Sequence, residues 1–250
     1  MTLAFRVIAR LDVKGANVIK GVQFEGLRVV GKPSELARKY AEQGADELLY
    51  LDTVASLYGR ANLTAIIEEA SDGVFIPITA GGGVRSVDDV RRLLAAGADK
   101  IALNTGAIAD PSLIARCADR VGRQAIVCSV EAKATGAGNW EAYTDQGRTR
   151  SHRCAVQWAC EAARLGAGEI LLTAIDRDGT QRGADVALAH AVQAQVGCPV
   201  VLAGGIGTAQ QAREAATVSD AIALGTALHY GRTDIPSVKA ALAGAGRVVR

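Results

Sequence analysis

The feature that most constrains the fold of this 250-residue chain is an internal repeat of about half its length. The segment PITAGGGV, which begins at Pro77, matches PVVLAGGI, which begins at Pro199, with an offset of 122 residues. At the same offset, GADELL from Gly44 matches GAGEIL from Gly166. A chain built from two copies of one block needs a fold with internal symmetry, because each copy buries the same apolar pattern.

Short apolar runs alternate with amphipathic stretches along both copies. The runs are almost continuously apolar, which is typical of strands buried on both faces of a parallel sheet. Several of the intervening stretches begin with Pro, Ser or Thr and end in glycine, as helices do. The runs predicted to be strands are 5–11, 47–52, 75–80, 100–104, 125–130, 169–175, 199–203 and 221–225.

Eight strand–helix units in a chain of this length predict an α/β fold, a (β/α)8 TIM barrel built from two homologous half-barrels. The alternative is an open doubly wound sheet, which carries a GxGxxG turn after its first strand. Here the first strand is followed by DVKGANVIKG, which lacks that motif. No linker or change in composition divides the chain, so we expect residues 1–250 to form one barrel domain.

Charge and composition argue against several classes of partner. The chain has 28 Lys and Arg against 26 Asp and Glu, a net charge of +2, so no strong field favours nucleic acid or an anionic membrane. Five cysteines without a CxxC motif indicate a reducing compartment, and we expect a cytoplasmic protein. The N-terminal segment has no apolar h-region, so we expect no signal peptide, and no apolar run is long enough to span a membrane.

Histidine placement gives no sign of a metal site. His152, His190 and His229 are predicted on helices or at their edges, without ligand spacing. Cys128 and Cys198 are predicted to be core residues. We expect neither a metal nor another cofactor.

Two glycine-rich turns occupy equivalent places in the two halves. Bare backbone amides between a strand and a helix bind phosphate well, and barrels of this type commonly do so after strands seven and eight. The alternative is that these are tight turns with no ligand. Two equivalent cradles favour a ligand with a phosphate at each end. The first comprises Gly82, Gly83, Asn104 and Thr105, and the second Gly204, Gly205, Gly225 and Thr226.

Two carboxylates end equivalent strands, Asp12 after the first and Glu131 after the fifth. The symmetry places them opposite each other at the barrel mouth, where they suit general acid and base catalysis between the two phosphates. Alternatively they form ion pairs with Lys14 and Lys133. Further candidates at strand ends are Lys20, Asp52, Thr173, Asp176, Asp178 and Gly179.

Charged residues also begin several strands. Arg6, Glu47, Lys100 and Glu169 are expected to gather at the opposite end of the barrel, its floor. Buried charges are costly unless they are paired, and two cations with two anions can close a ring. Such a ring is either a structural salt-bridge cluster or a gate for something that enters from below.

A long insert, residues 134–151, follows the fifth strand. Its WEAYT and GRTRS segments predict a small hairpin around Asp145-Gln146-Gly147. It is either a surface loop or a cover over the barrel mouth.

These motifs resemble the cyclase subunit of imidazole glycerol phosphate synthase. The resemblance covers essentially the whole chain, through RLDVK, VIKG, GADELLYLD, TAGGGVRS, GADKIALNT, GAGEILLTAIDRDGT and AGGIGT. It implies a glutaminase partner at the floor, whose ammonia passes through the barrel to a bis-phosphate substrate. The products would be imidazole glycerol phosphate and an aminoimidazole carboxamide ribotide.

The resemblance also implies roles for individual residues. Asp12 matches the first catalytic aspartate, Lys20 a lysine of the substrate loop, and Asp178 an acid near the second phosphate site. The four floor charges match a gate for ammonia.

The chain departs from the family pattern in several places. Glu131 replaces the second catalytic aspartate, Arg10 replaces a cysteine, and Lys14 is followed by Gly-Ala-Asn instead of Asp-Gly. The usual Ile-Thr-Ala-Ser after the second strand is Thr53-Val54-Ala55-Ser56, followed by Leu-Tyr-Gly-Arg at 57–60.

These departures look like a paralogous branch that delivers ammonia, with a glutaminase and a sugar amidotransferase as companions, for amidination of nucleotide-linked sugars in surface polysaccharide synthesis. A third alternative is isomerisation of the same bis-phosphate by the sister half-barrel family, which needs no charged floor ring.

Overall fold

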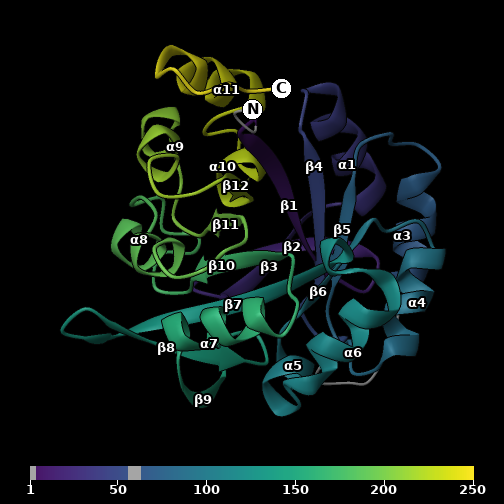
Figure 1. Ribbon diagram of the computed structural model, residues 1–250. Coiled ribbons are helices and arrows are strands. Elements are labelled where there is room, and N and C mark those ends of the chain that lie inside the picture. Colours follow the sequence, from purple (N-terminus) through teal and green to yellow (C-terminus); the bar gives the residue numbers. More distant parts are fainter. Residues whose placement is uncertain (1–3, 56–62) are drawn as a thin grey trace.

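The computed structural model describes residues 4–55 and 63–250 and shows a closed parallel barrel (Figure 1). Each barrel strand pairs with the next in chain order, and the last pairs with the first to close the ring. The barrel strands are β1 (Arg6–Lys14), β4 (Glu47–Asp52), β5 (Ile78–Gly81), β6 (Lys100–Leu103), β7 (Ile126–Gly136), β10 (Glu169–Ala174), β11 (Val200–Ala203) and β12 (Ala221–Leu224). The predicted TIM barrel is confirmed.

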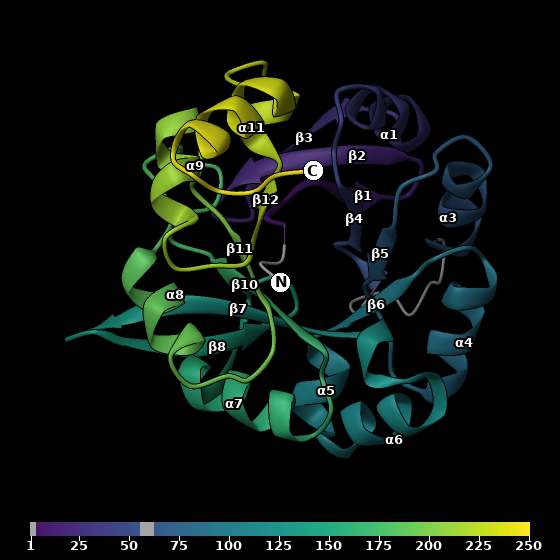
Figure 2. The same cartoon turned by 45° about the horizontal axis from the view of Figure 1, so that its top comes forward.

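Helices form an outer ring around the strands (Figure 2). Their first turns are capped as expected: Ser86 and Asp89 form a capping box, and the side chains of Asp185, Thr208 and Asp234 accept backbone N–H bonds. The helices are α1 (Pro33–Glu42), α3 (Leu63–Ser71), α4 (Val87–Ala95), α5 (Thr105–Ala109), α6 (Ser112–Val121), α7 (Ala155–Arg164), α8 (Val186–Gln193), α9 (Ala209–Ala215), α10 (Thr226–His229) and α11 (Ile235–Gly244), with a 3-10 turn at Arg123–Ala125.

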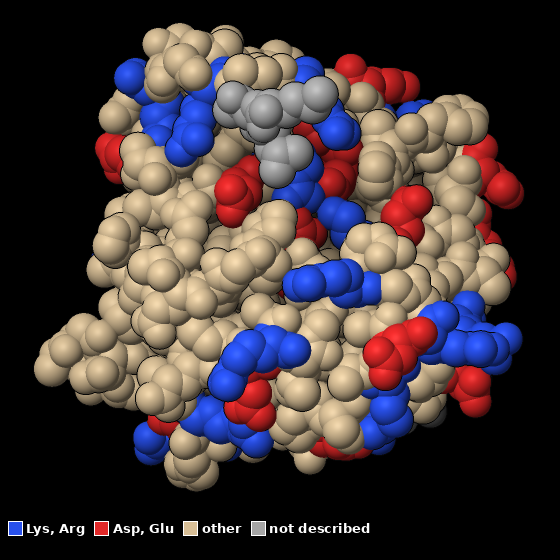
Figure 3. Space-filling view, viewed as in Figure 1, with Lys and Arg blue, Asp and Glu red and all other residues tan. Residues whose placement is uncertain are grey.

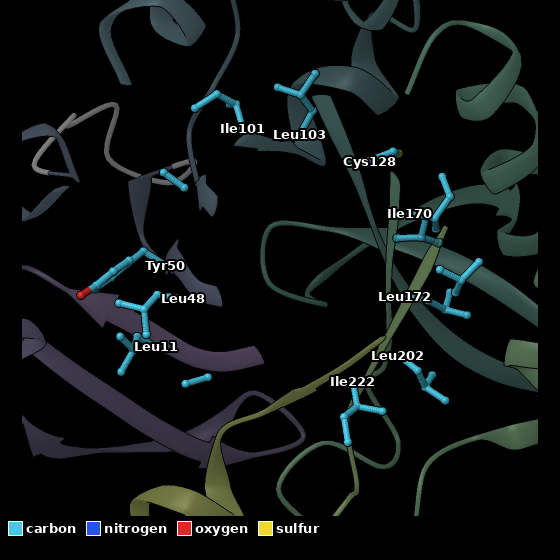
Figure 4. Packing of buried hydrophobic residues seen from close by; sticks show 14 of the residues in the cluster. Leu11, Leu48, Tyr50, Ile101, Leu103, Cys128, Ile170, Leu172, Leu202 and Ile222 are labelled. Atoms are coloured by element: carbon cyan, nitrogen blue, oxygen red, sulfur yellow. The ribbon is translucent and has the colours of Figure 1, made fainter. Parts of the chain in front are cut away.

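Alternate side chains of the barrel strands enter two different apolar layers. Those facing outward, such as Leu48, Ile101 and Leu172, are buried between the barrel and its helices (Figure 4). Those facing inward fill the lumen with a separate cluster that includes Ile8, Leu171 and several alanines. Burial on both faces explains why the strands are nearly continuous in apolar character.

The two halves of the chain share a hydrogen bond between an aspartate side chain and a backbone N–H at the floor of the barrel. The Asp99 carboxylate accepts a hydrogen bond from the N–H of Ile78 at 2.8 Å, and its equivalent in the second half, Asp220, accepts one from Val200 at 2.9 Å. In each case an aspartate just before one strand satisfies an N–H of the preceding strand in the barrel, which holds two neighbours in register.

Two hairpins interrupt the alternation of strands and helices. β8 (Asn139–Thr144) and β9 (Thr149–Cys154) form the hairpin predicted in the insert, and the paired ends of β7 and β8 project from the molecule (Figures 1 and 2). His152 lies in β9, the strand that directly precedes α7 (Ala155–Arg164), rather than on a helix or at its edge as predicted. The second hairpin, β2 (Asn17–Val22) with β3 (Glu25–Gly31), was expected to be a loop.

The surface shows acidic and basic side chains interspersed, without a large area of one sign on the face in Figure 3. Among the described residues, no helix is long and apolar enough to cross a lipid bilayer.

Candidate active site at the barrel mouth

Asp12 and Glu131 end strands that lie on opposite sides of the barrel. Four strand positions separate β1 from β7 in either direction around the closed ring. Both carboxyls belong to the inward-facing rows of their strands, and they are only 5% and 3% exposed. The structure therefore brings the two predicted acids to one site at the mouth.

Two buried cations neutralise Asp12. Arg10 Nε donates to Asp12 Oδ1 at 2.8 Å, and Lys20 Nζ donates to Asp12 Oδ2 at 2.8 Å. Lys20 also donates to both carboxylate oxygens of Asp178, at 2.8 and 3.1 Å, and so links β2 to the loop that follows β10. Burial by itself would raise the pKa of Asp12, but the charges of Arg10 and Lys20 hold it well below its ordinary value.

Glu131 is in the opposite electrostatic state. Burial, assisted by the negative charge of Asp12, raises the pKa of Glu131 to about 7, although the Arg10 charge and a hydrogen bond oppose the shift. That bond comes from the backbone N–H of Gly147, in the β8–β9 turn, to Oε2 at 3.2 Å. Asp12 is thus ionised near neutral pH while Glu131 can gain or lose a proton, which are the states an acid–base pair needs.

The alternative, ion pairs of the two carboxylates with Lys14 and Lys133, is not what the structure shows. Asp12 pairs with Arg10 and Lys20, and the ammonium of Lys133 lies 4.8 Å from the centre of the Tyr143 ring. The alternation of β1 puts Lys14 beyond the mouth, where it is exposed.

The first glycine turn lines a cavity that also contains Glu131. Gly82 and Gly83 have positive φ angles of 120° and 70°, and a Cβ on Gly82 would stand 2.5 Å from the carbonyl oxygen of Asp52. The conformation and the close approach both require glycine. The cavity is lined by Asp52, Gly82, Gly83, Asn104, Thr105, Ser129, Glu131 and Gln146, among others.

Asp52 organises the loop beside this cradle. Its Oδ1 accepts bonds from the N–H groups of Val54 and Ala55, at 2.9 and 3.0 Å. Burial raises its pKa despite these bonds. Part of the departure noted after the second strand, residues 56–60, lies outside the described residues.

The second glycine turn lines a separate cavity on the other side of the mouth. Gly204 and Gly205 have φ angles of 92° and 89°, and a Cβ on Gly205 would stand 2.2 Å from the carbonyl oxygen of Gly183. The lining comprises Arg10, Asp178, Gly179, Gln181, Gly204, Gly205, Ile206, Ala223, Leu224, Gly225 and Thr226. All the second-cradle residues predicted from the sequence thus meet here.

Each cradle contains a buried polar atom that lacks a hydrogen-bond partner among the described residues. These atoms are Asn104 Oδ1 in the first cradle and Thr226 Oγ1 in the second. Since buried polar groups are nearly always paired, these atoms mark places where a polar ligand would be held.

The insert closes over the first cradle. The hydroxyl of Thr105 accepts a hydrogen bond from the Asp145 N–H at 3.1 Å, and Gln146 lines the cavity. With the Gly147 bond to Glu131, the turn at the tip of the insert contacts the site, as the alternative of a cover over the mouth predicts.

The floor charges form a closed ring at the opposite end of the barrel. Lys100 Nζ lies 3.0 Å from a carboxylate oxygen of Glu47 and 3.0 Å from one of Glu169. Arg6 pairs with Glu47 at 2.7 Å and with Glu169, so every member has two partners of opposite charge. The ring is mostly buried, and its charges raise the pKa of Arg6 further despite burial.

Three groups were not predicted as site residues. Arg10 was noted only as a departure from the family, yet strict alternation from Arg6 to Asp12 would have placed it inside the barrel. Ser129 could have been found in the same way, two residues before Glu131. No local sequence pattern predicts a role for His229. Its Nδ1 lies 2.7 Å from the Tyr40 hydroxyl. Burial, and to a smaller extent the charge of Lys20, lower the pKa of His229 to about 4.

A family model described as histidine biosynthesis protein matches residues 6–234. The chain belongs to this histidine biosynthesis family. Three curated relatives of the family carry one name, imidazole glycerol phosphate synthase subunit HisF. The protein from Legionella pneumophila is 54% identical over 206 residues, which cover 82% of this chain and 97% of the relative. Those from Myxococcus xanthus and Nocardioides sp. are 47% and 49% identical over 250 and 258 residues, with 98–100% of each chain covered.

The similarity to the histidine biosynthesis family extends over both copies of the repeat. The matched range therefore spans the positions of both glycine cradles, the floor ring and the two carboxylates. Across the described part of the chain, no group of three or more His, Cys, Asp or Glu side chains is arranged to hold a metal ion.

Proposed function

We infer that this chain is the cyclase subunit of an imidazole glycerol phosphate synthase, which uses ammonia to form imidazole glycerol phosphate and an aminoimidazole carboxamide ribotide. The observation that carries this inference is the pair of phosphate cradles on either side of Asp12 and Glu131. Identity of 47–54% to three subunits of that name supports it.

The site residues divide the work as follows. The cradles at Gly82–Gly83 and Gly204–Gly205 hold the two phosphates. The ion pair of Lys20 with Asp178 lies beside the second cradle. Asp12 stays ionised and accepts or orients a proton on the substrate. Glu131 exchanges a proton near neutral pH, which suits the acid in ring closure and elimination.

Ammonia is proposed to come from a glutaminase partner docked at the floor. The ring of Arg6, Glu47, Lys100 and Glu169 covers the end of the lumen opposite the site, and small inward-facing residues such as Ala221 and Ala223 lie above it. An enzyme that only isomerised a bis-phosphate would have no use for such a ring, so the ring argues against the isomerase alternative. The proposal places the complex in the cytoplasm, where the five free cysteines stay reduced.

A second candidate function is a delivery subunit that passes ammonia to a sugar amidotransferase and forms no imidazole ring. One observation favours it: Glu131 carries one methylene more than the aspartate of the family pattern, while the floor ring is intact. Proton transfer depends strongly on the placement of the acid, so the longer side chain bears directly on cyclase activity.

One experiment separates the two functions. The purified chain is supplied with the bis-phosphate ribulosyl substrate and an ammonium salt, and imidazole glycerol phosphate is measured, in parallel with Glu131→Asp. Turnover by the wild type supports the cyclase. No turnover by either protein refutes the cyclase and favours delivery, whereas turnover by Glu131→Asp alone would show that the acid, rather than the fold, limits the reaction.

A further inference from the structure

Arg10 is a buried arginine whose guanidinium group is only partly used. Its side chain extends from β1 across the lumen, where Nη1 donates to the Thr173 hydroxyl on β10 at 3.0 Å, while Nε binds Asp12. The residue is 2% exposed. Its third nitrogen, Nη2, is buried and has no hydrogen-bond partner within the described ranges. Because the large majority of buried side-chain polar atoms have a hydrogen-bond partner, this nitrogen requires an explanation.

The position of Arg10 offers one. Arg10 lines the cavity of the second cradle, together with Gly204, Gly205 and Thr226, and the Thr226 hydroxyl is also buried with no hydrogen-bond partner among the described residues. Two unused groups therefore border one cavity, whose other lining residues include four glycines and Asp178, a carboxylate that is itself neutralised by Lys20. A phosphate oxygen is the chemistry that suits an arginine N–H, a hydroxyl and backbone amides at once.

We propose that Arg10 is a specificity-determining residue of the second cradle, and that its Nη2 donates a charge-assisted hydrogen bond to an oxygen of the phosphate monoester held there. The proposal rests on the proposed function in one respect, that the ligand carries a phosphate at each end. Asp12, Thr173 and the Phe24 ring, whose centre lies 5.6 Å from the guanidinium carbon, hold the side chain in place. Little side-chain freedom is therefore lost when the phosphate binds.

Arg10 also gives the two cradles different partners, which sets the direction in which the ligand binds. Asp12 and Glu131 are equivalent in the two halves, so the residue equivalent to Arg10 is Ser129, two positions before Glu131. Ser129 lines the first cavity as Arg10 lines the second. An arginine at one cradle and a serine at the other give the two ends of a bis-phosphate different partners, so the asymmetric ligand binds in one direction.

The test uses inorganic phosphate as the probe and the backbone amides as separate reporters of the two cradles. The 15N-labelled chain is titrated with phosphate, with Gly204 and Gly205 reporting the second cradle and Gly82 and Gly83 the first. We expect the wild type to bind phosphate more tightly at the second cradle. Arg10→Met should weaken binding there by roughly 10- to 100-fold and leave the first cradle unchanged, as the loss of one charge-assisted bond implies.

Arg10→Lys separates a direct contact from a general effect of charge. Lysine restores the positive charge beside Asp12 but offers no forked second nitrogen, so it should recover only part of the lost affinity. Full recovery would overturn the proposal, because charge alone would then explain the effect. Arg213→Met, at an exposed position on α9, is the matched control and should bind phosphate like the wild type.

The possible failures are distinguishable. If both pairs of amides respond in the wild type and respond equally in Arg10→Met, the role of Arg10 is refuted and the phosphate cradles stand. If neither pair responds in the wild type, the cradles themselves are refuted, and with them the proposed function. Should Arg10→Met fail to fold, Arg10→Lys decides: affinity equal to that of the wild type refutes the proposal, and a loss confined to Gly204 and Gly205 supports it.

Discussion

The raised pKa of Glu131 predicts that the stability of this protein falls as the pH rises. Glu131 holds its proton up to a pKa of about 7 in the folded chain, against an ordinary value of 4.5, because burial and the Asp12 charge disfavour the carboxylate. Below pH 4.5 the residue is protonated in both states and costs nothing. Between 4.5 and 7 only the unfolded chain releases the proton, so folding becomes less favourable, and above 7 the loss is complete.

The magnitude follows from the two pKa values. A shift from 4.5 to about 7 corresponds to about 3 kcal/mol of unfolding free energy, at roughly 1.4 kcal/mol for each pH unit. Glu131→Gln removes the titration while it keeps the shape and the acceptor for the Gly147 N–H. The variant should therefore be more stable than the wild type at pH 8 by up to about 3 kcal/mol, with most of this advantage lost at pH 5.

Urea denaturation followed by circular dichroism at pH 5, 6, 7 and 8 measures the difference. Only the difference between variant and wild type is compared, because His229, with its pKa lowered to about 4, contributes to both curves alike. Asp89→Asn is the control: backbone and hydroxyl hydrogen bonds lower the pKa of Asp89 below its ordinary value of 3.8, so its contribution is lost only in more acidic solution, and its difference from the wild type should stay constant from pH 5 to pH 8. A difference between Glu131→Gln and the wild type that is constant from pH 5 to pH 8 would refute the reasoning.

Three further predictions concern the site and the floor. Asp12→Asn should abolish cyclase turnover with ammonium salts and leave the circular dichroism spectrum unchanged; an unfolded variant would mean that Asp12 is structural. Gly205→Ala should lower the unfolding free energy by about 1–3 kcal/mol, because φ is 89° and the new Cβ meets the Gly183 oxygen, whereas Gly197→Ala, with no atom within 4 Å, should change it by less than about 0.5 kcal/mol in the same urea titration. Lys100→Met should destabilise the chain by about 1–3 kcal/mol, since Glu47 and Glu169 then share only Arg6 and the ring is partly solvent-exposed, and Lys100→Met/Glu169→Gln should recover part of that loss. If the double variant is no more stable than the single one, the ring is not the source of the effect.

Much of the barrel can be predicted from the sequence, because its strands and helices depend on short-range patterns. Continuous apolar runs, capping residues and the repeat predict the eight strands and their order, and the ends of those strands locate both cradles and the floor ring. The β2–β3 hairpin was not predicted, because the apolar residues between Lys14 and Pro33 are equally compatible with a loop that packs on the barrel mouth. Its two strands are defined by pairing with β1 and with each other, a tertiary contact.

Roles that depend on distances across the barrel could not be read in this way. Arg10 and Thr173 are 163 residues apart, and Lys20 and Asp178 are 158 apart, yet each pair forms a buried hydrogen bond. Sequence spacing predicts that Asp12 and Glu131 end equivalent strands, but it treats the two acids alike.

The sequence by itself determined a symmetric barrel with a glycine-rich turn and a carboxylate at the strand ends of each half. Only the tertiary structure decided how that symmetry is broken: two cations surround Asp12, whereas Glu131 meets a backbone N–H and the negative charge of Asp12. The physical reason is that a carboxyl's ionisation depends on its burial and on every charge within a few ångströms, and those neighbours come from all around the barrel.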